Sequence, residues 1–585
     1  MFCCVCPFLS FPFSKHLSVT HHARPTATML ARHLHADQIL DEAADHPHLK
    51  ILSDAGAGKF AEHGNIFAGK YETQGIPKHE IPEDGISEEA TYHLLTSELE
   101  LDGKPALNLA SFVHTSMPEW GERIINDNKY VNIVDQDEYP ATLAIHGRCI
   151  SQLANLWHAP REKDQNGEWK SAFGTATTGS SEAIMLGGLA MKKRWQEKRK
   201  AQGKPWKGLG NLVFGSNAQV AIEKFARYFD LEERLVPTSK ESHYRMDPKK
   251  AIEMVDEETV GVIVILGSTY TGHYEPVEEM SKLLDEYQTK TGIDVPIHVD
   301  GASGGMVAPF SHPSLKWDFQ IPRVVSINTS GHKFGMTQVG LGWVVFRSPD
   351  VVPKDLVFEL HYLGSTEYSF GLNFSRPAAP IIAQAFRFLS LGFNGYKSVM
   401  DSDLKNARLL SRALELSGKF EVLSDVHRPA GALSAIANKA GLGEDDAEFY
   451  EPGLPVIAFR WTDEFKQKHP HLQQSWVQTL LRVKGFIVPN YGLSPDCQNI
   501  EVLRVVVRET VTEHMIEELF TEIMRITEDL EQRDSPSAAL ALVGERQKSA
   551  HGTTTGGKHH RHPFGKHSHR PENHGVQATG YSKQC

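Results

Sequence analysis

The chain has 585 residues and a formal net charge of −12, with 40% hydrophobic and 23% charged residues. This length favours two to four domains, and the composition is typical of a soluble globular protein. The acidic balance argues against nucleic acid as a partner, because a phosphate backbone requires a basic face. No stretch approaches the roughly 18 consecutive apolar residues of a membrane span, so no membrane partner is expected. Six cysteines without zinc-binding spacing predict a reducing, cytoplasmic location and no disulfide framework.

The first part of the chain predicts a poorly ordered N-terminal extension over residues 1–60 and a helical segment over 61–106. A large domain is expected over 107–403, because strand-like apolar runs alternate there with helix-like stretches. The expected strands cover 212–215, 260–266, 297–300, 324–327 and 341–346, and the expected helices cover 182–201, 248–255 and 277–291. This alternation indicates βα units and a mainly parallel sheet.

The pattern changes after a long amphipathic helix that is expected over 395–417. A smaller α+β domain over 404–533 is predicted from strands at 456–461, 486–488 and 502–507 and helices at 475–484 and 513–531. Residues 534–585 are rich in Gly, Ser, Thr and His and have no apolar period, which predicts a disordered tail. Seven histidines between positions 551 and 574 leave metal binding by this tail open as an alternative.

A lysine follows the strand-like run at 324–327, in the segment SINTSGHKFG. Burial would lower the pKa of Lys333 and leave a free amine that can attack an aldehyde. Taken alone, Lys333 fits an ordinary surface lysine on a loop better. The segment HVDGASGG adds Asp300 at the end of another strand, where parallel α/β sheets bind ligands. Such a carboxylate could hold a pyridine nitrogen protonated, although it could also be a helix N-cap or a metal ligand.

The segment TATTGSSEAIMLGG places small polar residues before a helix. Ser180 or Ser181 is expected to be the N-cap, with Glu182 in the first turn, and a helix N-terminus of this kind binds phosphate. A plain capped helix is the alternative. Together, a phosphate site, a ring-nitrogen carboxylate and a lysine are what a pyridoxal-phosphate (PLP) enzyme of fold type I requires. The predicted fold class is therefore α/β, aspartate-aminotransferase-like, and no metal site is expected.

The chain resembles the glutamate decarboxylases, within the PLP-dependent amino-acid decarboxylases. The segments LWHAP, TGSSEAIMLGG, KFARY, GSTYTGHYE, HVDGASGG, SGHKFG and NFSRPAAPIIAQ carry the resemblance from about residue 105 to about 510. It implies a carboxy-lyase that converts L-glutamate to 4-aminobutanoate and CO2. It also implies a homodimer or a hexamer.

The resemblance also implies roles for single residues. Lys333 matches the Schiff-base lysine, Asp300 the ring-nitrogen partner, and Thr269 a support for the ring oxygen or the carboxylate side. The other matches are Ser180, Ser181, Ser330 and His332 near the phosphate, Gln219 and Ala302 on the two ring faces, and Ser375 reaching the phosphate of the neighbouring subunit.

For the substrate, Arg504 matches the arginine that holds the α-carboxylate. Strand alternation puts Arg508 on the same face, so spacing alone leaves both open, with a surface arginine as the alternative for Arg508. The distal-carboxylate pocket is matched by Ser111, Phe112, Asn132 and Asp135. Threonine is common in the family where Ser111 stands. An aspartate beside a substrate carboxylate requires a proton on one of them, which fits an enzyme favoured by acid pH.

Two alternatives accompany this interpretation. One is a PLP decarboxylase or lyase acting on aspartate or on a sphingoid-base phosphate. The second is a non-enzymatic PLP-fold scaffold that binds metal through its His-rich tail. A calmodulin-binding tail is not supported, because the C-terminal segment lacks a basic amphipathic helix with aromatic anchors.

Overall fold

The computed structural model describes residues 79–533, except residues 162, 164, 168–169, 171, 209, 361–366 and 440–445. The chain divides into two compact units, residues 1–102 and 103–585. In the first unit, helix α3 (Glu88–Leu99) follows the N-cap Ser87, whose hydroxyl accepts a hydrogen bond from the Ala90 amide. The predicted extension 1–60 and tail 534–585 lie outside the described residues. Every element named below belongs to the second unit.

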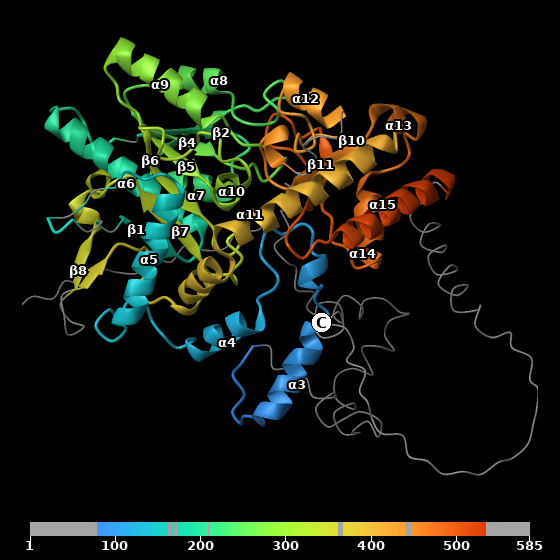
Figure 1. Ribbon diagram of the computed structural model, residues 1–585, viewed down its shortest axis with the longest axis horizontal. Coiled ribbons are helices and arrows are strands. Elements are labelled where there is room, and N and C mark those ends of the chain that lie inside the picture. Colours follow the sequence, from blue (N-terminus) through green and yellow to red (C-terminus); the bar gives the residue numbers. More distant parts are fainter. Residues whose placement is uncertain are drawn as a thin grey trace, which may run out of the picture. The chain divides into compact units, whose positions relative to one another are not determined.

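A seven-stranded sheet occupies one half of the second unit, in the order β1-β7-β6-β5-β4-β2-β3 (Figure 1). Its strands are β1 (Gly174–Thr177), β2 (Asn211–Gly215), β3 (Glu232–Val236), β4 (Thr259–Ile265), β5 (Ile297–Asp300), β6 (Val324–Thr329) and β7 (Gly342–Phe346). Pairing is parallel from β6 through β5, β4 and β2 to β3, whereas β7 pairs antiparallel with β6 and β1. The prediction of a mainly parallel sheet is confirmed.

Both faces of this sheet are covered, which explains why its strand β4 is apolar along its length. In β4, Val262 and Val264 belong to one hydrophobic cluster, while Ile263 and Ile265 belong to another. The helices are α4 (Glu119–Asp127), α5 (Pro140–Leu156), α6 (Ser180–Ala201), α7 (Val220–Tyr228), α8 (Pro248–Glu253), α9 (Val277–Thr291) and α10 (Ala308–Ser311). Helix α6 packs on one face, against β7, β6 and β4. A short hairpin of β8 (Phe358–Leu360) and β9 (Glu367–Ser369) stands apart from the sheet.

A second, antiparallel sheet has the order β10-β11-β13-β12. Its strands are β10 (Phe420–Val422), β11 (Val456–Trp461), β12 (Asn490–Gly492) and β13 (Glu501–Val506), accompanied by α12 (Ala432–Lys439), α13 (Asp463–Lys468), α14 (Ser475–Val483) and α15 (Glu513–Arg533). The predicted strand at 486–488 is wrong. Only Ile487 makes a bridge there, to Asn108, and Phe486 and Val488 are buried in a loop. A short apolar run does not distinguish a strand from a buried loop.

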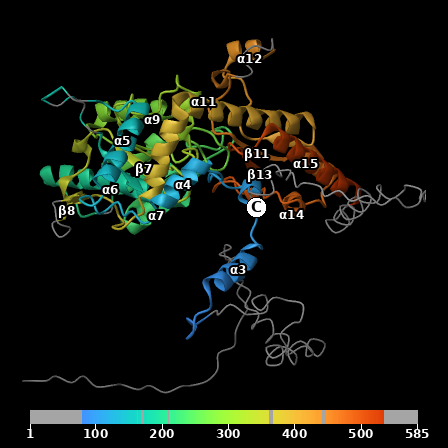
Figure 2. The ribbon, with the colours of Figure 1, turned by 60° about the horizontal axis from the view of Figure 1, so that its bottom comes forward.

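Helix α11 (Ala379–Leu416) extends from the large sheet to the small one (Figure 2). It packs against α4 and α5 and, further along, against β10 and α15. The prediction of a helix over 395–417 missed its first part. Gly392, with a φ of 61°, interrupts the helix, and Pro380 stands in its first turn, where a missing N–H is tolerated. Across the part of the chain that the structure describes, every helix is too short or too polar to cross a membrane.

Candidate active site

A cavity of about 320 Å3 lies at the carboxyl ends of β4, β5 and β6, beside the N-terminus of α6. That edge is where open parallel sheets bind ligands, and the volume suits a small organic molecule. The predicted residues that line it are Ser180, Ser181, Gln219, Thr269, Asp300, Ala302, Ser330, His332 and Lys333. Of the ten predicted cofactor residues, Ser375 is therefore absent from this lining.

Lys333 extends its amine into the site, where Nζ donates a hydrogen bond to Ser303 Oγ at 3.4 Å. The amine also lies 5.2 Å from the centroid of the Phe112 ring. Burial lowers the pKa of Lys333 from its ordinary value, against the effect of Asp300, and the positive charge of Arg504 lowers it further. A lowered pKa increases the fraction of neutral amine, which is the nucleophilic form.

Asp300 ends β5 and is 4% exposed. Its Oδ1 accepts hydrogen bonds from the Ala302 amide at 3.0 Å and from Asn328 Nδ2 at 2.9 Å. Asn328 Oδ1 then faces His298 Nε2 at 2.8 Å, and His298 Nδ1 faces Ser326 Oγ at 2.7 Å. Because Asn328 Oδ1 can only accept, His298 donates through Nε2 and accepts from the Ser326 hydroxyl.

These residues form one hydrogen-bonded chain of polar side chains that ends at Asp300. We call it the Asp300 relay, and its members are Ser326, His298, Asn328 and Asp300. All four are buried, and burial lowers the pKa of His298 to about 4, so the ring is neutral at neutral pH. The sequence analysis missed the first three. Their signal is the period-two spacing of polar residues, 298 with 300 and 326 with 328, in two neighbouring buried strands.

The N-terminus of α6 differs from the prediction. Gly179 is the N-cap, and neither Ser180 nor Ser181 caps the helix. Ser180 lies inside the first turn, and its Oγ is 2.6 Å from Ser330 Oγ. Glu182 accepts hydrogen bonds from the amide and the hydroxyl of Thr178, at 2.8 and 3.0 Å. The helix N-terminus and the paired hydroxyls face the cavity together, which is the arrangement that binds a phosphate.

His332 and Gln219 stand at the borders of the same cavity. Burial lowers the pKa of His332, and the charge of Lys333 lowers it further. His332 Nδ1 accepts from the Leu341 amide at 3.4 Å, and the His332 carbonyl accepts from the His114 amide at 2.9 Å. Gln219 is the N-cap of α7, and its Oε1 accepts from the Ala221 amide at 2.7 Å.

Arg504 stands on β13 of the small sheet, outside the residues that line the Lys333 cavity. Its guanidinium donates to the Thr269 carbonyl at 2.7 Å and to the Ala110 carbonyl at 2.5 Å. It is also 5.1 Å from the centroid of the Phe112 ring, which Lys333 approaches as well. The Phe112 ring therefore lies near both the lysine amine and the arginine guanidinium.

Arg508 is not the surface arginine that the sequence analysis kept as an alternative. It is 1% exposed and donates to the carbonyls of Val113 at 2.5 Å and Asn108 at 3.0 Å. Strand β13 ends at Val506, so the strand period that placed both arginines on one face does not reach Arg508. Arg508 instead braces the loop that carries Ser111 and Phe112. In that loop, Ser111 Oγ accepts from the Val113 amide at 3.1 Å.

Three predicted residues lie together elsewhere in the chain. Asn132 Nδ2 donates to Ser375 Oγ at 3.2 Å, and Asn132 Oδ1 accepts from the Arg376 amide at 3.1 Å. Asp135 follows on the same segment, and its amide donates to the Asn132 carbonyl at 3.2 Å. None of these three lines the Lys333 cavity of its own chain.

The residues around the cavity fit PLP. A buried amine, a carboxylate at a strand end, and two hydroxyls at a helix N-terminus are donors of the kind that an aldehyde, a pyridine nitrogen and a phosphate require. The mainly parallel sheet and the small antiparallel sheet complete the pattern. Fold and site together define a PLP-dependent decarboxylase of fold type I.

Comparison with known proteins narrows this class. The model of the pyridoxal-dependent decarboxylase conserved domain matches residues 96–434. Glutamate decarboxylase 5 of Arabidopsis thaliana is 44% identical, over 82% of this chain and 90% of the relative. Glutamate decarboxylase of Saccharomyces cerevisiae is 43% identical, over 77% and 78%. The chain belongs to the glutamate decarboxylases of the pyridoxal-dependent decarboxylase family.

Solved structures agree with this assignment. Lactobacillus brevis glutamate decarboxylase superposes with a TM-score of 0.71 at 33% identity, covering 80% of this chain and 98% of that one. A Burkholderia pseudomallei sphingosine-1-phosphate lyase superposes with a TM-score of 0.61 at 19% identity, covering 83% and 99%. The second likeness concerns the fold alone.

Proposed function

We propose that the chain removes the α-carboxylate of L-glutamate as CO2, leaving 4-aminobutanoate, with PLP as its cofactor. The observation that carries this proposal is that the Lys333 amine and the Arg504 guanidinium both lie near the Phe112 ring, in a chain of this family. When bound, PLP supplies an electron sink for the bond that breaks. The protein supplies binding, orientation and proton control.

Lys333 is the amine that would hold the cofactor aldehyde. Asp300 would keep the pyridine nitrogen protonated, and the relay below it holds the carboxylate in one orientation. Ser180, Ser181, Ser330 and His332 would receive the phosphate at the N-terminus of α6, while Gln219 and Ala302 would flank the ring and Thr269 would support its oxygen or carboxylate side.

Arg504 would bind the α-carboxylate of the substrate and turn its bond to Cα perpendicular to the cofactor ring. The carbonyls of Thr269 and Ala110 fix the guanidinium, so little orientation is lost when substrate binds. Ser111 and Phe112 would form the near wall of the distal-carboxylate pocket. Where bound cofactor and substrate displace water from the cavity, each charge interaction in the site becomes stronger.

Asn132, Asp135 and Ser375 would serve the neighbouring subunit of a homodimer. Their support is that Asn132 bonds Ser375, the residue that by resemblance reaches the phosphate of the neighbouring subunit. The proposed dimer therefore has two shared active sites, each completed by the partner, and a hexamer of three such dimers is compatible with this sharing. Where Asp135 lies beside a substrate carboxylate, one of the two carboxyl groups must carry a proton. Acid pH favours that protonation.

The remaining proposals follow from the sequence. The domain limits 107–403 and 404–533 stay predictions, with α11 running across the boundary between them. A cytoplasmic location is proposed from the cysteine pattern, together with two free, buried cysteines, Cys149 and Cys497.

The deciding experiment is a product assay with glutamate and aspartate side by side, over about pH 4 to 8 so that both acid and base limbs are sampled. We expect 4-aminobutanoate from glutamate, a preference for acid pH and no comparable product from aspartate. Lys333→Ala, assayed in parallel, controls for contaminating activity. Turnover of aspartate at the rate of glutamate, or no turnover of either by the PLP-loaded protein, would contradict the proposal.

A further inference from the structure

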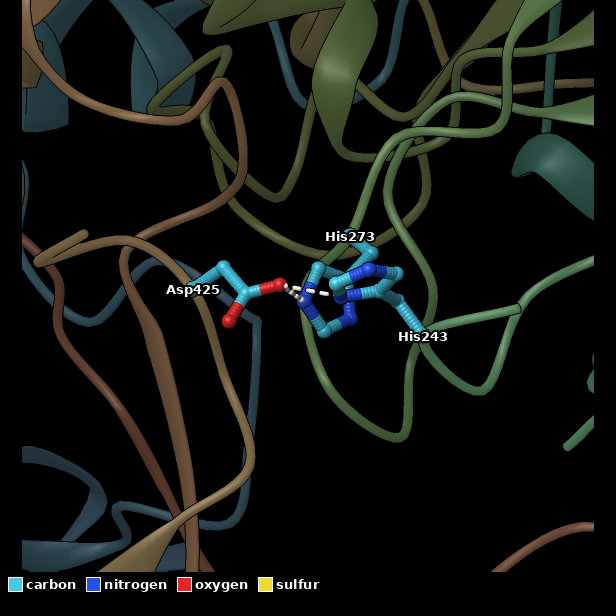
Figure 3. Close-up of side chains that lie close together, drawn as sticks. All are labelled: His243, His273 and Asp425. Carbon is cyan, nitrogen blue, oxygen red and sulfur yellow. Dashed lines mark hydrogen bonds and ion pairs between the residues drawn. The ribbon is translucent and has the colours of Figure 1, made fainter. Parts of the chain in front are cut away.

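A second group of chemically active side chains lies away from the PLP cavity (Figure 3). His243 Nδ1 is 2.7 Å from Asp425 Oδ2, and His273 Nε2 is 3.0 Å from the same oxygen. The three atoms all lie within 4.8 Å of one another. Two imidazole nitrogens and one carboxylate oxygen gathered this closely are a donor set that zinc and similar ions use.

The most buried of these ligands already has the support that metal sites provide. The other ring nitrogen of His273, Nδ1, lies 2.7 Å from Thr271 Oγ1. A metal-bound histidine usually donates its second N–H to an oxygen, which fixes the ring and leaves Nε2 free for the ion. Ser424 is next to Asp425. Its hydroxyl donates a hydrogen bond to the Thr271 carbonyl at 2.8 Å and accepts one from the Ala458 amide at 2.9 Å.

The exposed fraction of the side chain rises from His273 through Asp425 to His243, so the cluster opens to solvent on the side of His243. The His273 side chain is 5% exposed, that of Asp425 is 23% exposed and that of His243 is 57% exposed. An ion could therefore enter beside His243 and keep water as a fourth ligand. The neighbouring cation Arg245 is engaged elsewhere, because its guanidinium donates to the Tyr274 carbonyl at 2.5 Å.

The cluster connects two parts of the fold. His273 belongs to the loop after β4, which also carries Thr269, the residue whose carbonyl accepts from Arg504. Asp425 follows β10 of the small sheet, and His243 precedes α8. An ion bound by all three would fasten the loop of the large sheet to the small sheet.

We propose that His243, His273 and Asp425 bind one divalent ion of the zinc class, and that this ion clamps the loop after β4 to the segment after β10. The site departs from the expectation of no metal. Sequence spacing did not indicate it, because Asp425 is 152 positions from His273 and 182 from His243. The proposal does not depend on the substrate of the PLP site.

The test measures binding of Zn2+ to the full-length, PLP-loaded protein after treatment with a chelator. Glutamine replaces the seven tail histidines between positions 551 and 574 in every sample, since the tail is itself a possible metal ligand. Isothermal titration calorimetry should give one ion per chain, and Co2+ should add a visible ligand-field band. His243→Gln and Asp425→Asn should each weaken binding by at least about tenfold, since loss of even an outer-shell partner of a metal ligand costs about ten- to a hundredfold.

His514→Gln is the matched control. His514 is exposed and faces a single carboxylate, Glu518, at 3.4 Å, so its replacement should leave Zn2+ binding unchanged. His243 is mostly exposed, and its replacement should leave the circular dichroism and the PLP absorbance unchanged. Equal Zn2+ affinity in His243→Gln and in the tail-substituted parent would overturn the proposal, as would no Zn2+ binding by that parent. The second result would leave a hydrogen-bonded His–Asp–His bridge without a metal.

Discussion

Replacing His298 by leucine tests whether the Asp300 relay acts as a unit. The ring contacts Ser326 Oγ at 2.7 Å and Asn328 Oδ1 at 2.8 Å, and both partners are 0% exposed. Leucine would leave two buried polar atoms without a partner, at about 1–3 kcal/mol each, so we expect a loss of about 2–6 kcal/mol. Asn328 would also be released from its orientation. The weakened hydrogen bond to the Asp300 carboxylate should lower kcat by about ten- to a hundredfold, with little change in KM.

Urea unfolding at a fixed protein concentration measures the stability, and production of 4-aminobutanoate measures kcat and KM. His298→Gln is the matched control, because its side-chain amide can still donate to Asn328 and should recover part of both losses. A leucine variant with the unfolding midpoint and kcat of the parent would refute the reasoning. A loss of stability without any loss of kcat would refute only the part that concerns Asp300.

The other predictions concern the lysine, the arginines, the shared site and pH. Lys333→Ala should abolish turnover and the visible absorbance of bound cofactor; a spectrum like that of the parent would contradict its role. Arg504→Lys should raise KM for glutamate, whereas Arg508→Lys should lower the urea midpoint; the reverse result would exchange the two roles. Mixed and refolded Lys333→Ala and Asp135→Ala chains should recover about a quarter of parent activity if dimers share sites, and none if they do not. Burial lowers the pKa of His146 from 6.5 to about 4, so the folded protein favours the neutral ring. The contribution of His146 to stability is therefore complete above pH 6.5 and is lost as the pH falls towards 4. Urea midpoints should show a shallower acid decline in His146→Gln than in the parent.

Strong local patterns account for what could be predicted of the fold. A continuous apolar run located β4, since a parallel strand that is buried on both sides has no polar face. The part of α11 before residue 395 was missed because Gly392, with a φ of 61°, interrupts the helix there. The run at 486–488 was assigned as a strand because its apolar residues are buried, although burial there comes from loop packing.

Site residues could be predicted where a single sequence motif contains them. Contacts between residues far apart in the sequence were less predictable. Lys333, Asp300 and Ser180 each stand in a recognisable segment, and the structure brings them to one cavity. The bracing of Arg504 by the Thr269 carbonyl was not accessible, because it joins positions 235 residues apart and uses backbone atoms. The capping role given to Ser180 or Ser181 failed for a related reason, since the Ser180 hydroxyl is committed to Ser330, 150 residues away.

Helix α6 links the phosphate end of the site to the ring end. Its N-terminus brings Ser180 to Ser330, and seven residues later Gly187 faces the His298 ring of the Asp300 relay. A Cβ at Gly187 would lie 2.6 Å from two atoms of that ring, so only glycine allows the helix to pack this close to β5. The same close packing covers the relay and excludes water from it. The contact between α6 and β5 at Gly187 therefore sets the distance from the hydroxyls at the phosphate end to the carboxylate at the ring end. Gly187 itself touches neither end.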